Sequence, residues 1–372
     1  MPADSIARSI RRLCIAGVLL CFMVVVLGAY VRLTTAGLGC PDWPGCYGHL
    51  TPAGAESAGA ASAFPGRPLE PGKAWREMIH RYAVGTLSVL VILVTALAIS
   101  GRRQRPASVP LALALVATLI MQALLGMLTV TWRLNPLIVT LHLLFGMTTL
   151  ALLWWLLLTL PRGARAALAP QGARHPVSGG AAATLALARR LTLLGLTVLA
   201  VQLALGGWTS SNYAAIACPD FPTCQNAWWP HGDFGNAFVP WRGLEFNYEG
   251  GVLDNSARIA IHLTHRLGAV LTTAALGLAA LFVLRAHPGE SPPPLTAGAQ
   301  RTAGRALSSG RRWHGLAAAR PHAFLVLAAL ALQLTIGMTM VLEGFPLWLA
   351  TAHTAGAALL LLATLALLRA LI

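Results

Sequence analysis

The chain has 372 residues, of which 56% are hydrophobic and only 10% are charged. Soluble domains are about 45–50% apolar and about 25% charged, so the composition excludes a soluble globular protein and indicates one embedded in a membrane. The net charge of +15 comes from Lys and Arg residues that gather on one side of the predicted membrane. This distribution is a topology signal, so we expect no nucleic-acid partner.

Eight apolar runs are long enough to cross about 30 Å of hydrocarbon. We predict an all-α integral membrane protein with spans at residues 13–34, 78–100, 109–131, 137–160, 190–209, 259–285, 322–342 and 346–370. No Ala-x-Ala-like cleavage site follows the first run, so we interpret it as a span of the mature chain rather than a signal peptide. The basic residues precede the first run, follow the even-numbered runs and close the chain, which places both termini in the cytoplasm.

A seven-residue cysteine motif follows the first apolar run and recurs after the fifth. It reads Cys40-Pro-Asp-Trp-Pro-Gly-Cys46 and then Cys218-Pro-Asp-Phe-Pro-Thr-Cys224. The predicted topology puts both copies outside the cytoplasm, where disulfides persist, so we predict that each loop is closed by a disulfide staple. A redox-active dithiol and a metal site stay open as alternatives, although both motifs lack the Cys-x-x-Cys spacing of such sites.

The duplication extends beyond the cysteine motifs. Gln122-Ala-Leu-Leu-Gly126-Met matches Gln333-Leu-Thr-Ile-Gly337-Met, and a histidine lies twenty residues after each glutamine. Each half holds four spans, an even number, so the repeats run in the same direction across the membrane. We predict two tandem, parallel-repeat four-helix bundles at residues 1–160 and 188–372, joined by a cytoplasmic linker at 161–187.

Three other connecting stretches separate the predicted spans. Residues 51–63 and 286–320 have low-complexity or Pro-rich compositions that predict connections without a function of their own. The stretch 225–257 carries several aromatic residues, including Trp228 and Trp229. These suit a cap at the membrane interface, and an entry to a buried site is the alternative.

Four histidines fall on the even-numbered spans: His80, His142, His265 and His353. The predicted span starts put His80 about one turn inside the membrane and the other three about two turns inside, which is roughly 5–11 Å below the outer surface at 1.5 Å per residue. A single histidine in a membrane helix is often a hydrogen-bonding residue, but four at one depth favour ligands. Zinc would need further ligands, whereas two imidazoles on facing helices suit a haem. We therefore pair His80 with His142 and His265 with His353.

Charged neighbours distinguish the two halves. Arg81 and Arg266 each follow a candidate ligand and could pair with haem propionates or extend to the membrane surface. Helix 78–100 is preceded by Glu77, one turn before His80 on the same face, whereas His262 stands at the matching place before His265. A carboxylate suits proton abstraction beside a substrate, so we predict chemistry in the N-terminal half. Stabilisation of a helix N-terminus is the alternative role of Glu77.

Together these residues resemble the haem A synthase family, membrane enzymes that convert haem O to haem A for cytochrome oxidase. The chain is similar to the form with a cysteine pair in each half. The resemblance covers both halves and all eight predicted spans, and it is carried by Gly28-Ala-Tyr-Val-Arg32-Leu-Thr, both cysteine motifs, Glu77-Met-Ile-His80-Arg81, His142, His265-Arg266 and His353.

The resemblance implies that the substrate haem O lies between His80 and His142, and that a haem B cofactor lies between His265 and His353. Glu77 matches the acidic residue that the family uses beside the substrate. The implied reaction oxidises a ring methyl to a formyl group by successive hydroxylations, with oxygen from water, to give haem A. It also implies a possible electron-accepting role for Cys40–Cys46 beside the staple role, while Cys218–Cys224 stays structural.

Two other classes remain open. A dihaem b-type electron-transfer cytochrome would also use paired histidines, and a transporter could be built from repeats, although helix-breaking residues near the membrane midplane are not evident. Candidate partners are haem O, the farnesyltransferase that makes it, oxidase assembly factors, the lipid bilayer and a second copy of the chain. The short segment before the first span leads us to expect a bacterial inner membrane rather than a mitochondrial one.

Overall fold

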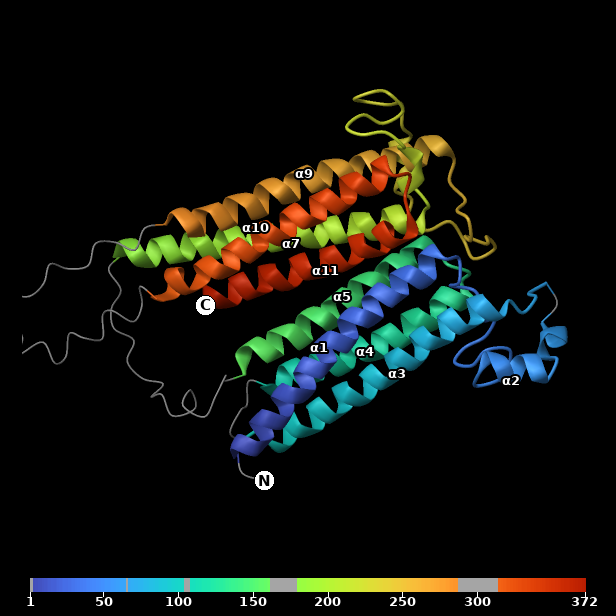
Figure 1. Ribbon diagram of the computed structural model, residues 1–372, viewed down its shortest axis with the longest axis horizontal. Coiled ribbons are helices and arrows are strands. Elements are labelled where there is room, and N and C mark those ends of the chain that lie inside the picture. The colour runs from blue at the N-terminus through green and yellow to red at the C-terminus, as the bar shows by residue number, and fades with distance from the viewer. Residues whose placement is uncertain (1–2, 65, 104–107, 161–178, 287–313) are drawn as a thin grey trace, which may run out of the picture.

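The structure is a computed structural model that describes residues 3–64, 66–103, 108–160, 179–286 and 314–372 (Figure 1). Eight of its helices are long and apolar enough to cross a membrane, which confirms the predicted all-α membrane fold. They are α1 (Ala3–Leu33), α3 (Pro71–Ser100), α4 (Ser108–Thr131), α5 (Pro136–Thr159), α7 (Gly179–Ser211), α9 (Asn255–Arg285), α10 (His314–Leu342) and α11 (Leu347–Ala370). The described ranges contain two isolated β-bridges but no strand.

Several helices begin earlier than the apolar runs predicted. Helix α3 begins at Pro71, since proline fits the first helical turn, where its missing N–H is not needed. Helix α9 begins at Asn255, where the Asp254 side chain accepts a hydrogen bond from the Ala257 amide at 3.0 Å. Such polar turns lie beyond the apolar run of each helix, so hydropathy alone places these starts too late.

Two predicted connections are shorter than expected. Helix α7 begins at Gly179, so the end of the predicted linker 161–187 is helical, and α10 begins at His314 inside the predicted stretch 286–320. Both helix starts consist of small or polar residues, which extend a helix without adding apolar length. The remainder of each stretch lies almost wholly outside the described residues.

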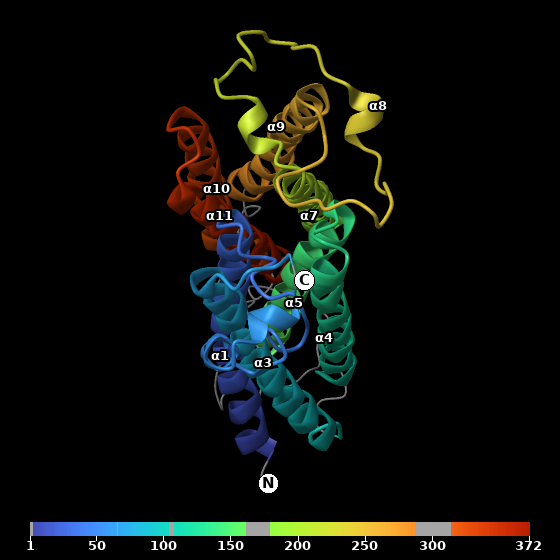
Figure 2. The ribbon, with the colours of Figure 1, turned by 90° about the vertical axis from the view of Figure 1, so that its right-hand side faces the viewer.

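The eight long helices pack in two groups of four. In the first group α1 packs on α3, α3 on α4, α4 on α5 and α5 on α1. In the second group α7 packs on α9, α9 on α10, α10 on α11 and α11 on α7. The groups lie side by side in both views (Figures 1 and 2), and they meet through α1 and α5 on one side and α7 and α11 on the other.

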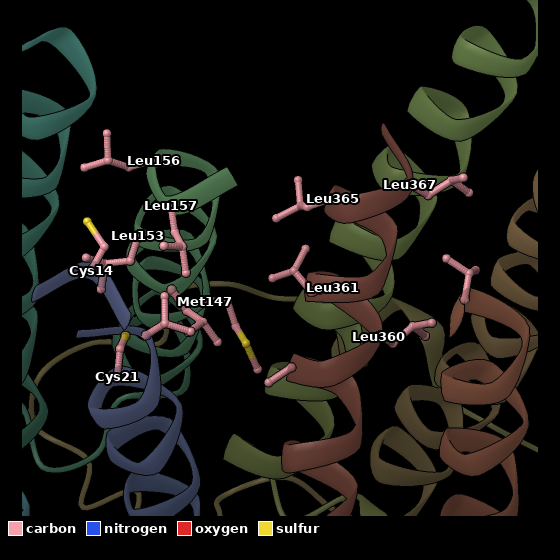
Figure 3. Close-up of a cluster of buried hydrophobic side chains, with 14 of the residues drawn as sticks. Cys14, Cys21, Met147, Leu153, Leu156, Leu157, Leu360, Leu361, Leu365 and Leu367 are labelled. Atoms are coloured by element: carbon pink, nitrogen blue, oxygen red, sulfur yellow. The ribbon is translucent and has the colours of Figure 1, made fainter. Parts of the chain in front are cut away.

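One continuous apolar cluster joins the two groups. Its members come from both groups and include Cys14 on α1, Leu153 on α5 and Leu361 on α11 (Figure 3). The indole Nε1 of Trp154 on α5 donates a hydrogen bond to the Leu362 carbonyl on α11 at 2.9 Å. In lipid, helices associate through close packing and such hydrogen bonds, so this contact holds the groups together.

The ends of the two groups that carry the cysteine loops, called the outer ends below, are joined by polar contacts. The Arg32 guanidinium at the end of α1 donates to the carbonyls of Ser210 and Ser211 at the end of α7, at 3.1 and 3.3 Å. It also lies 4.0 Å from the centre of the Tyr213 ring. The last carbonyls of a helix have no partner within that helix. Arg32 thus supplies donors to the last carbonyls of α7.

The aromatic stretch 225–257 covers the first group of helices at this end. Tyr248 is buried among Leu38, Val130 and Leu134, and its amide donates to the Arg133 carbonyl at 3.1 Å. Trp241 makes an edge contact with Trp132 at the end of α4, with 5.3 Å between ring centres. The stretch therefore links the outer ends of the two halves.

Four short helices complete the connections at the outer end. Helices α2 (Pro52–Ser57) and η1 (Ala60–Ala63) lie within the stretch 51–63, and Thr51 caps α2 by accepting from the Gly54 amide at 3.1 Å. Helices η2 (Ala215–Ala217) and α8 (Phe234–Ala237) lie on either side of the second cysteine loop. Although its composition is simple, the stretch 51–63 is therefore partly helical.

Replacing Tyr248 by Ala tests the link between the halves. Removal of a fully buried aromatic ring costs roughly 3–5 kcal/mol, so we expect earlier thermal unfolding and faster proteolysis within residues 225–257. Trp228→Ala is the control, because Trp228 is 76% exposed in the same stretch. Equal proteolysis of the two variants would contradict the role assigned to Tyr248.

Candidate functional site

Each of the four histidines packs against a glycine of the neighbouring helix. A methyl group at Gly28, Gly126, Gly206 or Gly337 would come to 3.1, 3.5, 3.2 or 3.0 Å from the Cε1 atom of His80, His142, His265 or His353 respectively. The distances at Gly28, Gly206 and Gly337 are shorter than nearly all contacts of real side chains, so a larger residue there would have to displace the ring, whereas the distance at Gly126 is an ordinary contact. The same imidazole–glycine contact thus occurs in all four helix pairs.

The four glycines hold equivalent positions. Each lies five residues before the end of its helix, at Leu33, Thr131, Ser211 and Leu342. The histidines lie near the starts of the partner helices, which begin at Pro71, Pro136, Asn255 and Leu347. All eight residues therefore share one layer near the end of the molecule that carries the cysteine loops.

The depth of His80 differs from the sequence prediction. It was expected about one turn inside its helix, but α3 begins at Pro71, so His80 lies in the third turn. His265 also lies in the third turn of α9, while His142 and His353 lie in the second turns of α5 and α11. The correction makes the histidines of the two halves more alike in depth than the sequence suggested.

The two histidines of the C-terminal half approach each other. The ring centres of His265 and His353 lie 6.5 Å apart with nearly perpendicular planes. His80 and His142 lie in the same layer, each against the glycine of its neighbouring helix. Since a bond between a metal and an imidazole nitrogen is about 2 Å long, the centres of two rings on opposite sides of one metal ion lie about 6 Å apart. The measured separation therefore fits two axial ligands of one ion.

The surroundings of the rings also fit a metal held by two histidines. The Nδ1 atoms of His80 and His142 are buried and lack a hydrogen-bond partner, so the rings are not used as structural hydrogen-bonding groups. Within the described ranges, no three or more His, Cys, Asp or Glu residues are grouped to hold a metal ion. The donor set therefore suits a haem, whose porphyrin supplies the remaining ligands, better than zinc.

Glu77 is the one acidic residue within the eight described spans. Its side chain is buried, and one carboxylate oxygen accepts from the Cys40 amide at 2.9 Å. The other oxygen forms an ion pair with the Arg81 guanidinium. A buried carboxylate in a membrane helix is costly and usually marks a functional site, and here it is stabilised by one cation and one amide.

His262 takes the place of Glu77 in the second half. It is buried three residues before His265, and its Nε2 atom accepts from Nε of Arg266 at 3.3 Å. In each half, the residue three positions before the candidate ligand therefore contacts an arginine four positions further along the helix. The contacts are Glu77 with Arg81 and His262 with Arg266. The difference is that the first half holds a carboxylate and the second half a second imidazole.

Arg81 and Arg266 bind the cysteine loops. Arg81 donates to the carbonyls of Asp42, Pro44 and Gly45, and Arg266 donates to those of Cys218, Asp220, Pro222 and Thr223. The pairing of these arginines with haem propionates stays a prediction. Their contacts with protein atoms give them a further role, which is to hold each cysteine loop over the histidine layer.

Both cysteine loops have the predicted disulfides and the same internal support. Sulfur–sulfur distances are 2.05 Å for Cys40–Cys46 and 1.93 Å for Cys218–Cys224. In the first loop, Asp42 accepts from the amides of Tyr47 and Gly48 at 2.6 and 2.8 Å. In the second, Asp220 accepts from the matching amides of Gln225 and Asn226 at 2.7 and 3.0 Å. The aspartate of each motif thus shapes the turn that follows the second cysteine.

Three glutamines near the histidines were not predicted as functional residues. Gln122, Gln202 and Gln333 each lie four residues before a ring-packing glycine and donate to a histidine of the neighbouring helix. The sequence holds the signal, because Gln-x-x-x-Gly occurs near the end of α4, α7 and α10. We interpreted this pattern as a sign of duplication at Gln122 and Gln333, and we did not recognise it at Gln202.

The fold and site define a multi-pass helical membrane protein with four histidines in one layer under two disulfide loops. Comparison with known proteins gives the family. The model of the COX15-CtaA family, cytochrome oxidase assembly protein, matches residues 11–304. The chain belongs to this family.

Relatives in several bacteria carry the name "Heme A synthase". The chain is 40% identical to one from Shewanella oneidensis over 345 residues, which is 91% of this chain and 90% of the relative. It is 28% identical to one from Shouchella clausii over 225 residues, which is 60% and 66% of the two chains. It is 34% identical to one from Listeria monocytogenes over 132 residues, which is 35% and 38%.

The second cysteine loop should be sensitive to acid. The Thr223 hydroxyl, which donates to Asp220, and the amides of Gln225 and Asn226 hold the pKa of this carboxyl below its usual value. A lowered pKa means that the carboxylate stabilises the loop fully above the usual Asp value of about 3.9 and ceases to do so as pH falls through the lowered one. We therefore expect amide protection at Gln225 and Asn226, measured by hydrogen exchange, to fall only at such acidic pH.

The Asp220→Asn variant provides the control for this prediction. Asn keeps an acceptor oxygen but does not titrate in this range, so its loop should be less protected at neutral pH and should lack the acid transition. An acid transition of unchanged position in this variant would show that another group controls the loop.

Proposed function

We propose that this protein is a haem A synthase, which oxidises a ring methyl of haem O to the formyl group of haem A. The observation that carries the proposal is the pair of histidines at haem-ligand separation in a chain 40% identical, over 91% of its length, to a relative with that name. The single buried carboxylate beside one histidine pair supports an enzyme over a carrier of electrons.

We infer that the two groups of helices are tandem repeats of one four-helix bundle, with different tasks. The N-terminal bundle, residues 1–160, holds the substrate haem O between His80 and His142. The C-terminal bundle, residues 188–372, holds haem B between His265 and His353. The presence of Glu77 in one bundle and His262 at the matching place in the other supports this division.

Glu77 is the proposed base for the reaction. Oxidation of a methyl group with oxygen from water releases protons, so the site needs a group that accepts them. Glu77 lies on the His80 face of α3, one turn nearer the outer end, and its carboxylate is already stabilised by Arg81 and the Cys40 amide. Arg81 maintains the carboxylate in its charged form, while haem B, when bound, supplies one-electron transfer.

The first disulfide lies next to this base. The Cys40 amide donates to Glu77, and Cys40 is bonded to Cys46. A disulfide at this place is close enough to the carboxylate to share in the oxidation as an electron acceptor, and Cys218–Cys224 lies over a half without a carboxylate. We therefore keep an electron-accepting role for Cys40–Cys46 within the proposal and a structural role for the second pair.

The proposed orientation places both termini in the cytoplasm and both cysteine loops in the periplasm of a bacterial inner membrane. Basic residues such as Arg102 and Arg103 beyond α3 support it through the positive-inside rule. All four histidines then lie in the outer leaflet, nearer the side where the disulfides persist.

Glu77→Gln tests the proposed base. The amide keeps an acceptor for the Cys40 amide but carries no charge, so the protein should fold, bind haem O and lose haem A production by about 100-fold or more. Glu70→Gln is the matched control, since Glu70 is exposed at the start of the same helix. Pigment extraction and chromatography measure the product, and normal haem A formation by a folded Glu77→Gln protein would refute the role.

His80→Ala and His265→Ala test the assignment of the two sites. We expect His80→Ala to lose haem O or haem A and keep haem B, and His265→Ala to show the reverse, because each change removes one axial ligand. Extracted pigments identify which haem remains. Haem B alone in the wild-type protein under conditions where haem O is made would instead support a dihaem b-type cytochrome.

A further inference from the structure

The two histidine pairs differ in how their rings are held. Nε2 of Gln202 lies 3.1 Å from Nδ1 of His265 and donates to its backbone carbonyl at 3.0 Å. Nε2 of Gln333 lies 3.2 Å from both ring nitrogens of His353. Both ligands of the C-terminal half therefore have a carboxamide in contact with the ring.

The N-terminal pair has no such contact. Gln122 donates to the backbone carbonyl of His142 at 3.0 Å, but Nδ1 of that ring is buried without a partner. At His80 the glutamine itself is missing, because Val24 stands four residues before Gly28. The Nδ1 atom of His80 is likewise buried without a partner.

A glycine on the histidine helix makes room for each ring-bound carboxamide. A methyl group at Gly268 would come to 2.1 Å from Oε1 of Gln202, and one at Gly356 would come to 2.2 Å from Oε1 of Gln333. Both glycines lie three residues after the histidine. The residue three positions after His80 is Ala83. Helix α3 therefore lacks the glycine that would make room for a carboxamide, and α1 lacks the glutamine that would supply it.

The carboxamide can serve a ring that binds iron. When Nε2 of a neutral imidazole is the ligand, its proton lies on Nδ1, which then needs an acceptor. The Oε1 atoms of Gln202 and Gln333 are buried and have no hydrogen-bond partner, so each amide can turn to present its oxygen to Nδ1. At Gln202 this exchanges the hydrogen bond with the His265 carbonyl for one with the ring. A hydrogen bond at Nδ1 fixes the ring and raises its basicity as a ligand.

Given the proposed haem sites, on which this inference rests, we propose that Gln202 and Gln333 are positioning residues that make the C-terminal haem a permanent cofactor. The absence of ring contacts at His80 and His142 leaves the N-terminal ligands free to release one haem and accept another. This difference suits a half that must exchange substrate for product beside a half that must keep its cofactor.

The test measures haem retention in the full-length purified protein. Gln202→Leu and Gln333→Leu should transfer the C-terminal haem to excess apomyoglobin about 10-fold or more faster than wild type, and its ferric low-spin electron paramagnetic resonance signal should shift. Gln122→Leu is the matched control, because its amide reaches no ring nitrogen. It should leave the C-terminal signal and transfer rate unchanged.

Two further variants separate positioning from folding. Gly268→Ala keeps Gln202 but displaces its amide, so it should reproduce the Gln202→Leu signal in a protein of unchanged thermal stability. Val24→Gln with Ala83→Gly adds the missing contact at His80, and it should slow transfer of the N-terminal haem and make haem A co-purify.

Unchanged transfer rates and signals in Gln202→Leu, Gln333→Leu and Gly268→Ala would overturn the inference, as would unchanged N-terminal transfer in the double variant. A wild-type protein without a C-terminal bis-histidine haem would instead overturn the proposed function.

Discussion

The packing of an imidazole against a helix glycine is the contact on which the rest of this structure depends. It occurs between α1 and α3, α4 and α5, α7 and α9, and α10 and α11. A methyl group at Gly28, Gly206 or Gly337 would press on the imidazole of the neighbouring helix at 3.0–3.2 Å, so the ring or the helix would have to shift. Helix separation, histidine depth and the direction of each ring are therefore set by one local constraint that is repeated four times.

A second chain of contacts connects this layer to the outer surface. The carbonyls of the first cysteine loop bind Arg81, Arg81 binds Glu77, and Glu77 binds back to the Cys40 amide. The charge of the carboxylate is thus balanced within one turn of helix, which lowers the cost of keeping it at this depth. The disulfide loop is consequently part of the environment of the carboxylate as well as a cap over the bundle.

The sequence was sufficient for the spans and the cysteine pairs, because apolar length and internal repetition report these directly. It misplaced the start of α3, since Pro71 and the polar turn after it extend a helix without adding hydropathy. It also could not show that Arg81 and Arg266 bind loop carbonyls, or that Gln202 reaches the His265 ring. Those contacts depend on which faces of two helices meet, and span prediction does not include that information.

A duplicated site can diverge only where packing does not prescribe the residue. A glycine faces each of the four histidines, and at Gly28, Gly206 and Gly337 the distance to the ring is too short for a larger residue without a shift. Three of the positions that differ between the halves are Glu77 against His262, Val24 against Gln202 and Ala83 against Gly268. All three lie around the first histidine of each half, His80 or His265, and none alters the glycine contact. In the proposed function, the shared frame sets where each haem is held. The neighbours then determine whether the histidine ring has a carboxamide contact and whether a carboxylate lies beside it. Chemistry and retention can in this way be separated between two halves that keep the same architecture.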